Sequence, residues 1–356
     1  MNALETIIRD VLVVQGSLSV AAYMEIALQH PEHGYYRTRE PLGRTGDFIT
    51  APEISQMFGE MIGVWCAEAW HRLGDPSPFA LVELGPGHGT MMQDILRATA
   101  HVGGFHAAKQ LYLLDSDVVL RRKQSEVLSD SKPVHIDAVS QLPSMPVLVV
   151  ANEFFDALPV RLFEKTFQGW AERMVTLDQK GLAFALRPLA DVEMNLIPAS
   201  LRDAVPGTCF EFSPEAQIRM RELARVLLSR RGAALIIDYG YTARPGFATV
   251  QAVSHHASAD IFERPGEVDL TAHVDFTALA DAARAGGANV SEAVGQGAFL
   301  RNCGIEIRAE ALKKNATDEQ RTAIDSALKR LIDDDQMGRL FKVMEIGKCS
   351  DLTTLG

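Results

Sequence analysis

Apolar residues recur at helical spacing in three stretches near the start of the chain. The first ends at Gly16, the second lies between Ser19 and Pro31, and the third is one long helix from near Pro52 to Gly74. Glycine and proline commonly mark helix ends at such positions. We therefore expect residues 1–75 to form an N-terminal helical segment that serves as a lid. The apolar positions of the first helix are Leu4, Ile7, Ile8, Val11 and Leu12.

The hydrophobic period changes from residue 79 onward. Short apolar runs alternate there with helical patterns, which is typical of a parallel sheet covered by helices. The helix before the fifth run has Ser213 as its expected N-cap and Pro214 at its first position. The pattern predicts an α/β, Rossmann-like fold with a mostly parallel sheet. The expected strands are 79–84, 111–115, 134–137, 147–151, 233–238, 289–293 and 341–347.

Residues 159–212 interrupt this alternation. Two strand-like runs, 172–177 and 182–186, flank the turn 178–181, as in a β-hairpin. We expect an inserted α+β segment that recognises the substrate. Its exposed apolar surface can bind a partner chain or a second copy. The core of the α/β fold would then be made of residues 76–158 and 213–356.

Composition and charge narrow the class of protein. With 47% hydrophobic and 23% charged residues among 356, the chain has the composition of a globular protein. A net charge of -11 argues against a nucleic-acid partner. No apolar run reaches the roughly 18 to 20 residues that cross a bilayer, so we expect no membrane insertion. Four widely spaced cysteines and no visible signal or transit peptide predict a cytoplasmic protein.

The most informative local motif is the glycine-rich turn between the first two predicted core elements. Gly85, Gly87 and Gly89 alternate with other residues, so the backbone can turn sharply and approach a ligand closely. Such a turn can serve a dinucleotide, S-adenosylmethionine or only the fold. A dinucleotide motif requires a glycine where Thr90 stands. The carboxylate of Glu83 suits a cationic ligand end, such as an amino acid ammonium, which favours S-adenosylmethionine.

Acidic residues end the next two predicted strands. Asp115 can accept hydrogen bonds from both hydroxyls of a ribose, as acids do at this position in dinucleotide-binding folds. Asp137 can accept a hydrogen bond from an adenine amine. Both acids have an alternative interpretation as helix caps or as groups that contact only solvent.

The fourth predicted strand is followed by an unusual concentration of polar groups. Asn152, Glu153 and Asp156 stand next to Phe154 and Phe155. Ligands of open parallel sheets bind at the carboxyl ends of the strands, so this segment should face the reacting group. In the alternative interpretation, Asn152 and Asp156 hold their own backbone and the two phenylalanines belong to the core.

These motifs resemble those of the MidA-like family of class I S-adenosylmethionine-dependent methyltransferases, over nearly the whole chain. Mitochondrial members of that family help to assemble respiratory complex I. The resemblance implies a seven-stranded sheet and S-adenosylmethionine as cofactor. It rests on HPEHGYY (30–36), GDFITAPEIS (46–55), ELGPGHGT (83–90), ANEFFDALP (151–159), WAER (170–173), IDYG (237–240), DLTAHVDF (269–276) and MGRLFK (337–342).

The chain departs from the family pattern at two places. The family usually has Glu-x-Ser-Pro after the second strand, where this chain has Asp115 and then Ser116-Asp117-Val118. His88 replaces a frequent arginine. An aspartate can still hold a ribose, with a shorter reach. The resemblance then implies as cofactor-binding residues Glu83, Gly85, Pro86, Gly87, Gly89, Asp115, Asp137 and Asn152.

The family resemblance further implies methylation of protein arginine, with a complex I subunit as the mitochondrial substrate. A guanidinium with a pKa above roughly 12 arrives protonated, so the site must orient it with carboxylates. Glu153, Asp156 and Glu172 are the candidates for that clamp. Tyr36, Asp47 and Phe48 are candidates for closing over the cofactor or the target chain.

Two other functions remain open from the sequence. The chain can be an assembly factor that binds S-adenosylmethionine without using it, or a nucleotide-dependent oxidoreductase. Thr90 and Glu83 disfavour the oxidoreductase. The histidine pairs at 30/33 and 255/256 have no further clustered ligands, so no metal site is expected. The protein partner can be a complex I subunit, and a homodimer is also possible.

Overall fold

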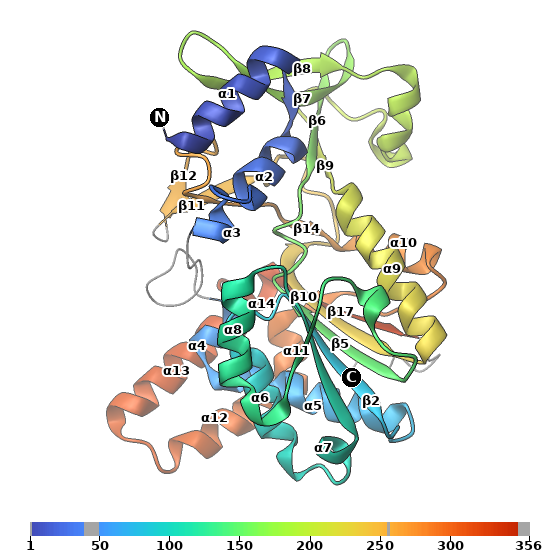
Figure 1. Cartoon of the computed structure of the whole chain (residues 1–356), viewed down its shortest axis with the longest axis vertical. Helices are drawn as coiled ribbons and strands as arrows, with labels where there is room; N and C mark the ends of the chain where they lie inside the picture. The colour runs from blue at the N-terminus through green and yellow to red at the C-terminus, as the bar shows by residue number, and fades with distance from the viewer. Residues whose placement is uncertain (1, 39–49, 255–256, 348–356) are drawn as a thin grey trace.

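Two lobes make up the part of the chain that the computed structural model describes, which comprises residues 2–38, 50–254 and 257–347 (Figure 1). The larger lobe is built on a nine-stranded sheet with the order β15-β17-β10-β5-β2-β3-β4, to which β14 and β16 are attached. The strands are β2 (Phe79–Leu84), β3 (Lys109–Leu114), β4 (Val134–Ile136), β5 (Val147–Asn152), β10 (Ala233–Tyr241), β14 (Val274–Asp275), β15 (Asn289–Val290), β16 (Val294–Gly295) and β17 (Phe341–Gly347).

The central strands of this sheet confirm the predicted alternation. β4, β3, β2, β5 and β10 pair in parallel, and β17 then runs antiparallel to β10. All six residues of β2 and of β5 are buried, because helices cover both faces. The predicted strand 289–293 is different: it is replaced by the short strands β15 and β16, which both pair with β17.

Helices cover the two faces of the sheet in separate layers. One hydrophobic core joins α5, α6, α7, α11, α12 and α13 to one face, and a second joins α9 and α10 to the other. No helix in the described ranges is long and apolar enough to span a lipid bilayer. The helices of this lobe are α4 (Ala51–Ile54), α5 (Gln56–Arg72), α6 (Thr90–Ala98), α7 (Phe105–Ala108), α8 (Val118–Val127), α9 (Pro214–Arg230), α10 (Phe276–Ala285), α11 (Gln296–Asn302), α12 (Ile305–Lys313), α13 (Asp318–Ile332) and α14 (Met337–Leu340).

The second lobe, at the top of Figure 1, contains a five-stranded and a three-stranded sheet. Its hydrophobic core combines α1 and α2 with residues of β6, β7 and β13. The predicted hairpin is present, with Leu177 of β7 opposite Leu182 of β8. Its elements are α1 (Ala3–Gln15), α2 (Val20–Gln29), α3 (Tyr35–Thr38), β1 (Leu18–Ser19), β6 (Arg161–Thr166), β7 (Gly169–Leu177), β8 (Leu182–Pro188), β9 (Cys209–Phe212), β11 (Gln251–Ser254), β12 (Ala257–Ala259) and β13 (Asp269–Thr271).

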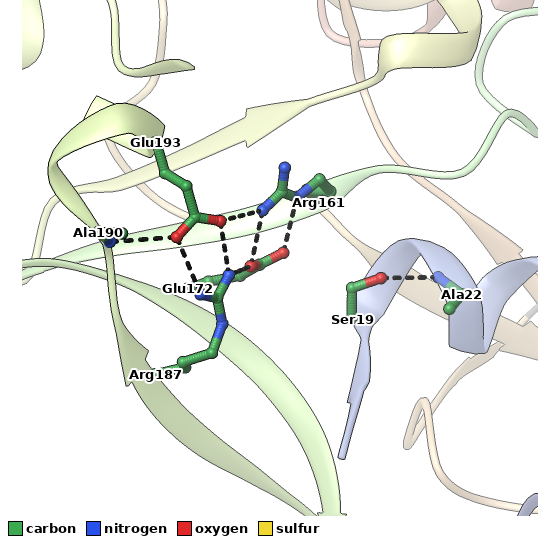
Figure 2. Close-up of polar contacts among 7 residues, drawn as sticks. All are labelled: Ser19, Ala22, Arg161, Glu172, Arg187, Ala190 and Glu193. Carbon is green, nitrogen blue, oxygen red and sulfur yellow. Dashed lines mark hydrogen bonds and ion pairs between the residues drawn. The ribbon is translucent and has the colours of Figure 1, made fainter. Parts of the chain in front are cut away.

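The N-terminal residues 1–75 are divided between the lobes. α1 ends at Gly16, which has a φ of 80°, and the Ser19 hydroxyl caps α2 by accepting a hydrogen bond from the backbone N–H of Ala22 at 3.1 Å (Figure 2). Both helices pack in the second lobe. The long third helix is interrupted at Ser55, whose extended backbone separates α4 from α5. α5 packs on α6 within the larger lobe, so the described part of this segment does not form one lid.

Candidate active site

A cavity of about 320 Å³ lies at the carboxyl ends of the parallel strands. Residues at or just after the carboxyl ends of β2, β3, β4, β5 and β10 line it. The second lobe contributes Gln29, Tyr36, Asp269 and Thr271. Ligands of open α/β sheets bind at this edge, where the strand order reverses. The cavity is therefore where the sequence placed the reacting groups.

The glycine-rich turn forms one side of the cavity. Gly85, Gly87 and Gly89 all have positive φ values, of 65°, 52° and 84°. A Cβ at Gly85 would also lie 3.1 Å from the Phe154 ring. Residues with a side chain are strained in this conformation, so the turn requires glycine and keeps its backbone open to a ligand. Pro86 lies in the same turn and lines the cavity.

Glu83 is the most unusual buried group beside this turn. Its side chain lines the cavity, it is only 2% exposed, and its Oε2 atom has no hydrogen-bond partner among the described residues. Burial, together with the nearby charge of Asp115, raises the pKa of Glu83 to about 8. A buried carboxylate without a partner is unfavourable unless a ligand supplies one. The position therefore fits the cationic end of a ligand.

Asp115 follows β3 and is fixed to the glycine-rich turn. Its Oδ1 accepts a hydrogen bond from the Asp117 backbone N–H at 2.9 Å, and its Oδ2 accepts one from the Gln124 amide at 2.7 Å. The same amide donates to the Gly87 carbonyl at 2.8 Å. Burial raises the pKa of Asp115. Gln124 thus holds the carboxylate and the turn in one arrangement, as binding of a ribose next to the turn requires.

Asp137 follows β4 and lies at the rim of the cavity. Its side chain is 72% exposed and forms an ion pair with Arg121. It therefore keeps both roles that the sequence left open, a solvent contact and an acceptor for a base at the cavity mouth.

Asn152 is the last residue of β5, and Glu153 follows it. Glu153 has a φ of 49°, and its backbone N–H donates to the Ile237 carbonyl of β10 at 2.9 Å. Its Oε1 accepts hydrogen bonds from the Asn152 amide at 3.0 Å and the Ala51 backbone N–H at 3.3 Å. Burial and the nearby Asp156 raise the pKa of Glu153 to about 7. These two hydrogen bonds to Oε1 fix the orientation of the Glu153 carboxyl group, and Glu153 lines the cavity.

Asp156 lies at the same end of the cavity and is held from β10. Its Oδ2 accepts a hydrogen bond from the Tyr239 hydroxyl at 2.6 Å, whereas its buried Oδ1 has no partner among the described residues. Burial raises the pKa of Asp156 to about 6. The Asp238 carboxylate accepts hydrogen bonds from the backbone N–H groups of residues 155 and 156, at 2.9 and 3.2 Å. The backbone of this segment is therefore held by Asp238 rather than by Asn152 and Asp156.

Several residues of the cavity were not selected from the sequence. Tyr239 lines the cavity, and the fully buried Asp238 before it ends the predicted strand 233–238. An acid at that position is the same signal that led to Asp115. Glu53 of α4 accepts a hydrogen bond from the Thr90 hydroxyl at 2.7 Å and lies 3.6 Å from His88. Phe155 is in the core, as the alternative interpretation expected, but Phe154 lines the cavity.

Glu172 lies elsewhere, which corrects its assignment to the clamp. It does not line the cavity; it belongs to a network of four charged side chains in the second lobe, with Arg161, Arg187 and Glu193 (Figure 2). Arg161 donates to both Glu172 oxygens at 2.8 Å. Burial alone would raise the pKa of Glu172, but the hydrogen bonds from the two arginines lower it instead. Both oxygens are therefore already engaged.

We expect Glu172→Gln to affect stability rather than chemistry. Glu172 is 1% exposed, so its loss leaves Arg161 without its buried partner, while the half-exposed Arg187 reduces the penalty. The free energy of unfolding should fall by about 2 kcal/mol, measured by urea denaturation. Glu164→Gln, which removes the more exposed pair with Arg173, should cost less. Loss of catalytic activity by folded Glu172→Gln protein would return Glu172 to the clamp.

The three lid candidates have different outcomes. The hydroxyl of Tyr36 donates to Asp269 Oδ1 at 3.3 Å, at the edge of the cavity. Burial and the charges of Asp269 and Asp156 raise the pKa of Tyr36 well above its usual value. Asp47 and Phe48 lie outside the described residues.

The cavity has a strong excess of acidic groups. Among the described residues that line it, Arg219 and His88 are the only basic side chains. The described ranges contain no cluster of three or more His, Cys, Asp or Glu side chains that could hold a metal ion. An acidic cavity of this kind fits organic cations. Its acidic lining residues are Glu53, Glu83, Asp115, Asp117, Asp137, Glu153, Asp156 and Asp269.

The sequence of the chain is similar to those of known methyltransferases. Residues 61–294 match a family described as "putative S-adenosyl-L-methionine-dependent methyltransferase". A Xenopus laevis protein named "Protein arginine methyltransferase NDUFAF7, mitochondrial" is 35% identical over 93% of this chain and 81% of its own length. The Homo sapiens protein of the same name is also 35% identical, over 83% of this chain and 72% of its own length.

A solved structure shares the whole architecture. A Burkholderia thailandensis protein crystallised with S-adenosyl-homocysteine has a TM-score of 0.84 and 32% identity, and the match covers 97% of this chain and 92% of that one. A native structure of a protein from the same organism has a TM-score of 0.82 and 31% identity. The expected fold class is thereby confirmed, and the S-adenosyl-homocysteine bound to the relative supports S-adenosylmethionine as the cofactor.

Proposed function

The chain belongs to this family of S-adenosyl-L-methionine-dependent methyltransferases, and we propose that its methyl acceptor is an arginine side chain of a protein. S-adenosylmethionine is its cofactor, and the Xenopus laevis and Homo sapiens relatives are named protein arginine methyltransferases. One observation carries the choice of acceptor. Two carboxyl groups, Glu153 and Asp156, lie at one end of the cavity, and a buried oxygen of Asp156 has no partner there.

The residues around the glycine-rich turn fit the cofactor. When bound, S-adenosylmethionine supplies an electrophilic methyl group on a sulfonium. The unpartnered Oε2 of Glu83 would accept its ammonium, and the open backbone at residues 85–89 would accommodate the methionine part. Asp115 would hold the ribose hydroxyls, and Asp137 at the rim would meet the adenine. Asn152, whose buried Oδ1 also lacks a partner in the described structure, lies between the two ends.

The acidic end would then prepare the acceptor. Glu153 and Asp156 bind the protonated guanidinium by charge-assisted hydrogen bonds and orient one nitrogen toward the methyl group. As the new N–CH₃ bond forms and the S–CH₃ bond breaks, the nitrogen gives up one proton. Glu153, with a pKa of about 7, is matched to receive it.

The proposal of a target protein rests on the family resemblance alone. We propose a subunit of respiratory complex I or its bacterial equivalent, methylated in the cytoplasm. A homodimer remains part of the same proposal. The described surface presents the apolar side chains of Phe167, Val192 and Val205 from the inserted segment, which can serve either partner.

We expect methylarginine as the product in a labelling experiment. Purified protein is incubated with methyl-labelled S-adenosylmethionine and a cell extract. The extract comes from a strain of the source organism in which the gene for this protein has been deleted. Mass spectrometry then locates the label. Label on arginine of a complex I subunit supports the proposal in full, and label on arginine of another protein supports the chemistry and overturns the target. Label confined to lysine, carboxylates or small molecules would overturn arginine as the acceptor.

The same experiment tests the second function that the sequence left open. An assembly factor that binds S-adenosylmethionine without using it gives no S-adenosylhomocysteine with any arginine-bearing target. The orientation of Glu153 by two hydrogen bonds favours the enzyme, because a site that only stores the cofactor has no need of an oriented carboxyl group. The third function, a nucleotide-dependent oxidoreductase, has no support from the relatives.

A further inference from the structure

The second lobe contributes an acidic wall to the cavity through β13. Side chains alternate between the two faces of a strand. Leu270, in the middle of β13, packs in the core of the second lobe, whereas Asp269 and Thr271 on either side line the cavity. Asp269 is only 6% exposed. Because of this alternation, the Asp269 carboxylate of the second lobe lines a site whose other acidic residues belong to the larger lobe.

Tyr36 fixes the position of this carboxylate. Its hydroxyl donates to Asp269 Oδ1 at 3.3 Å, and Tyr35, the preceding residue, is fully buried in the second-lobe core. Tyr36, Asp269 and Asp156 all line the same cavity. Asp269 is therefore near the clamp and is not an isolated surface acid.

A backbone contact joins the two walls at this point. The N–H of Ala272, directly after β13, donates to the carbonyl of Asp156 at 3.1 Å. The strand that carries Asp269 is thus attached to the segment that carries Asp156. The Tyr239 hydroxyl, which holds Asp156 Oδ2, belongs to the same end of the cavity.

We propose that Asp269 is an acceptor-binding residue, which holds the guanidinium together with Asp156, and that Tyr36 is its positioning residue. This inference rests on the proposed arginine acceptor. A guanidinium presents five N–H donors in one plane, on more than one edge. Glu153 and Asp156 approach from the larger lobe, and Asp269 supplies an acceptor from the opposite lobe. The acceptor site is therefore formed by both lobes together. It should bind the planar guanidinium of arginine in preference to the compact ammonium of lysine.

Direct binding of a small probe tests this without methyl transfer. The protein, saturated with S-adenosylhomocysteine, is titrated with Nα-acetyl-arginine amide, and binding is followed by NMR. We expect weak saturable binding to the unchanged protein and weaker binding of the lysine and citrulline analogues. Asp269→Asn should weaken arginine-amide binding by about tenfold or more, because it removes a charge-assisted contact. Tyr36→Phe should weaken it less, and Asp269→Glu should restore part of it.

Matched measurements separate this role from a structural one. Glu263→Gln removes an exposed acid from the same lobe and should leave probe binding unchanged. The affinity for S-adenosylhomocysteine should stay the same in every variant. Absence of probe binding to the unchanged protein, or equal binding by Asp269→Asn, would overturn the inference. If methylarginine forms while Asp269→Asn behaves normally, this inference fails alone; if the probe binds as expected but no methylarginine forms, the proposed function fails alone.

Discussion

Glu153→Gln should reduce methyl transfer by about a thousandfold while leaving cofactor binding intact. Glutamine keeps the shape of the side chain, and its oxygen can still accept the hydrogen bonds from Asn152 and Ala51. It cannot take up the proton of the guanidinium or balance its charge, and a well-placed proton acceptor is worth about 10² to 10⁴ in rate. Turnover is measured with the arginine substrate that labelling identifies, and affinity for S-adenosylhomocysteine by calorimetry.

The pH dependence gives the same residue a second test. Because the pKa of Glu153 is raised to about 7 and that of Asp156 to about 6, both groups lose their charge as the pH falls through that range. The kcat/KM of the unchanged enzyme should therefore fall below pH about 7. Glu153→Gln should lose the upper part of this transition. Glu126→Gln, a change at an exposed acid on α8, should behave like the unchanged enzyme. Unaltered turnover by Glu153→Gln would remove Glu153 from the clamp.

The cofactor end of the cavity was largely predictable from the sequence. It is made of strand ends and one turn, and the alternation of strands and helices fixes where those lie. Gly85, Glu83 and Asp115 are close in space because parallel neighbouring strands end at one edge of the sheet. The spacing of the apolar residues was therefore sufficient to predict that these three residues lie close together.

The acceptor end was less predictable because it joins segments far apart in the chain. Asp269 reaches the cavity only through the packing of α2 and β13 in the second lobe, which no local pattern reports. Tyr36 was selected from the sequence, but its contact with Asp269 was not. Glu172 failed for a different reason. The predicted turn 178–181 already places residue 172 opposite Arg187, the pairing that the structure shows. Pairing of opposite charges across a hairpin was thus visible in the sequence and favoured a structural role.

Asp115→Ala should weaken binding of S-adenosylmethionine and S-adenosylhomocysteine by about a hundredfold. The substitution removes a charged acceptor for the ribose hydroxyls, and each such hydrogen bond contributes about 1.5–3 kcal/mol. It also frees Gln124, which holds the glycine-rich turn at the Gly87 carbonyl. Calorimetric titration of the unchanged protein should give micromolar affinity, about -8 kcal/mol. Asp130→Ala, at an exposed acid after α8, is the control.

An acid on the ribose is common to many nucleotide-binding folds, so this variant alone does not identify the cofactor. Glu83→Gln completes the test, because only a ligand with an ammonium group has a use for that carboxylate. The pKa of Glu83 is raised to about 8, so the group is mostly neutral below that pH and must release its proton to meet a cation. Affinity for S-adenosylhomocysteine should therefore fall as the pH is lowered from about 8, and Glu83→Gln should bind weakly at every pH. NADH, which has no ammonium group, should bind poorly to both proteins; tight NADH binding that Glu83→Gln leaves unchanged would contradict the cofactor assignment.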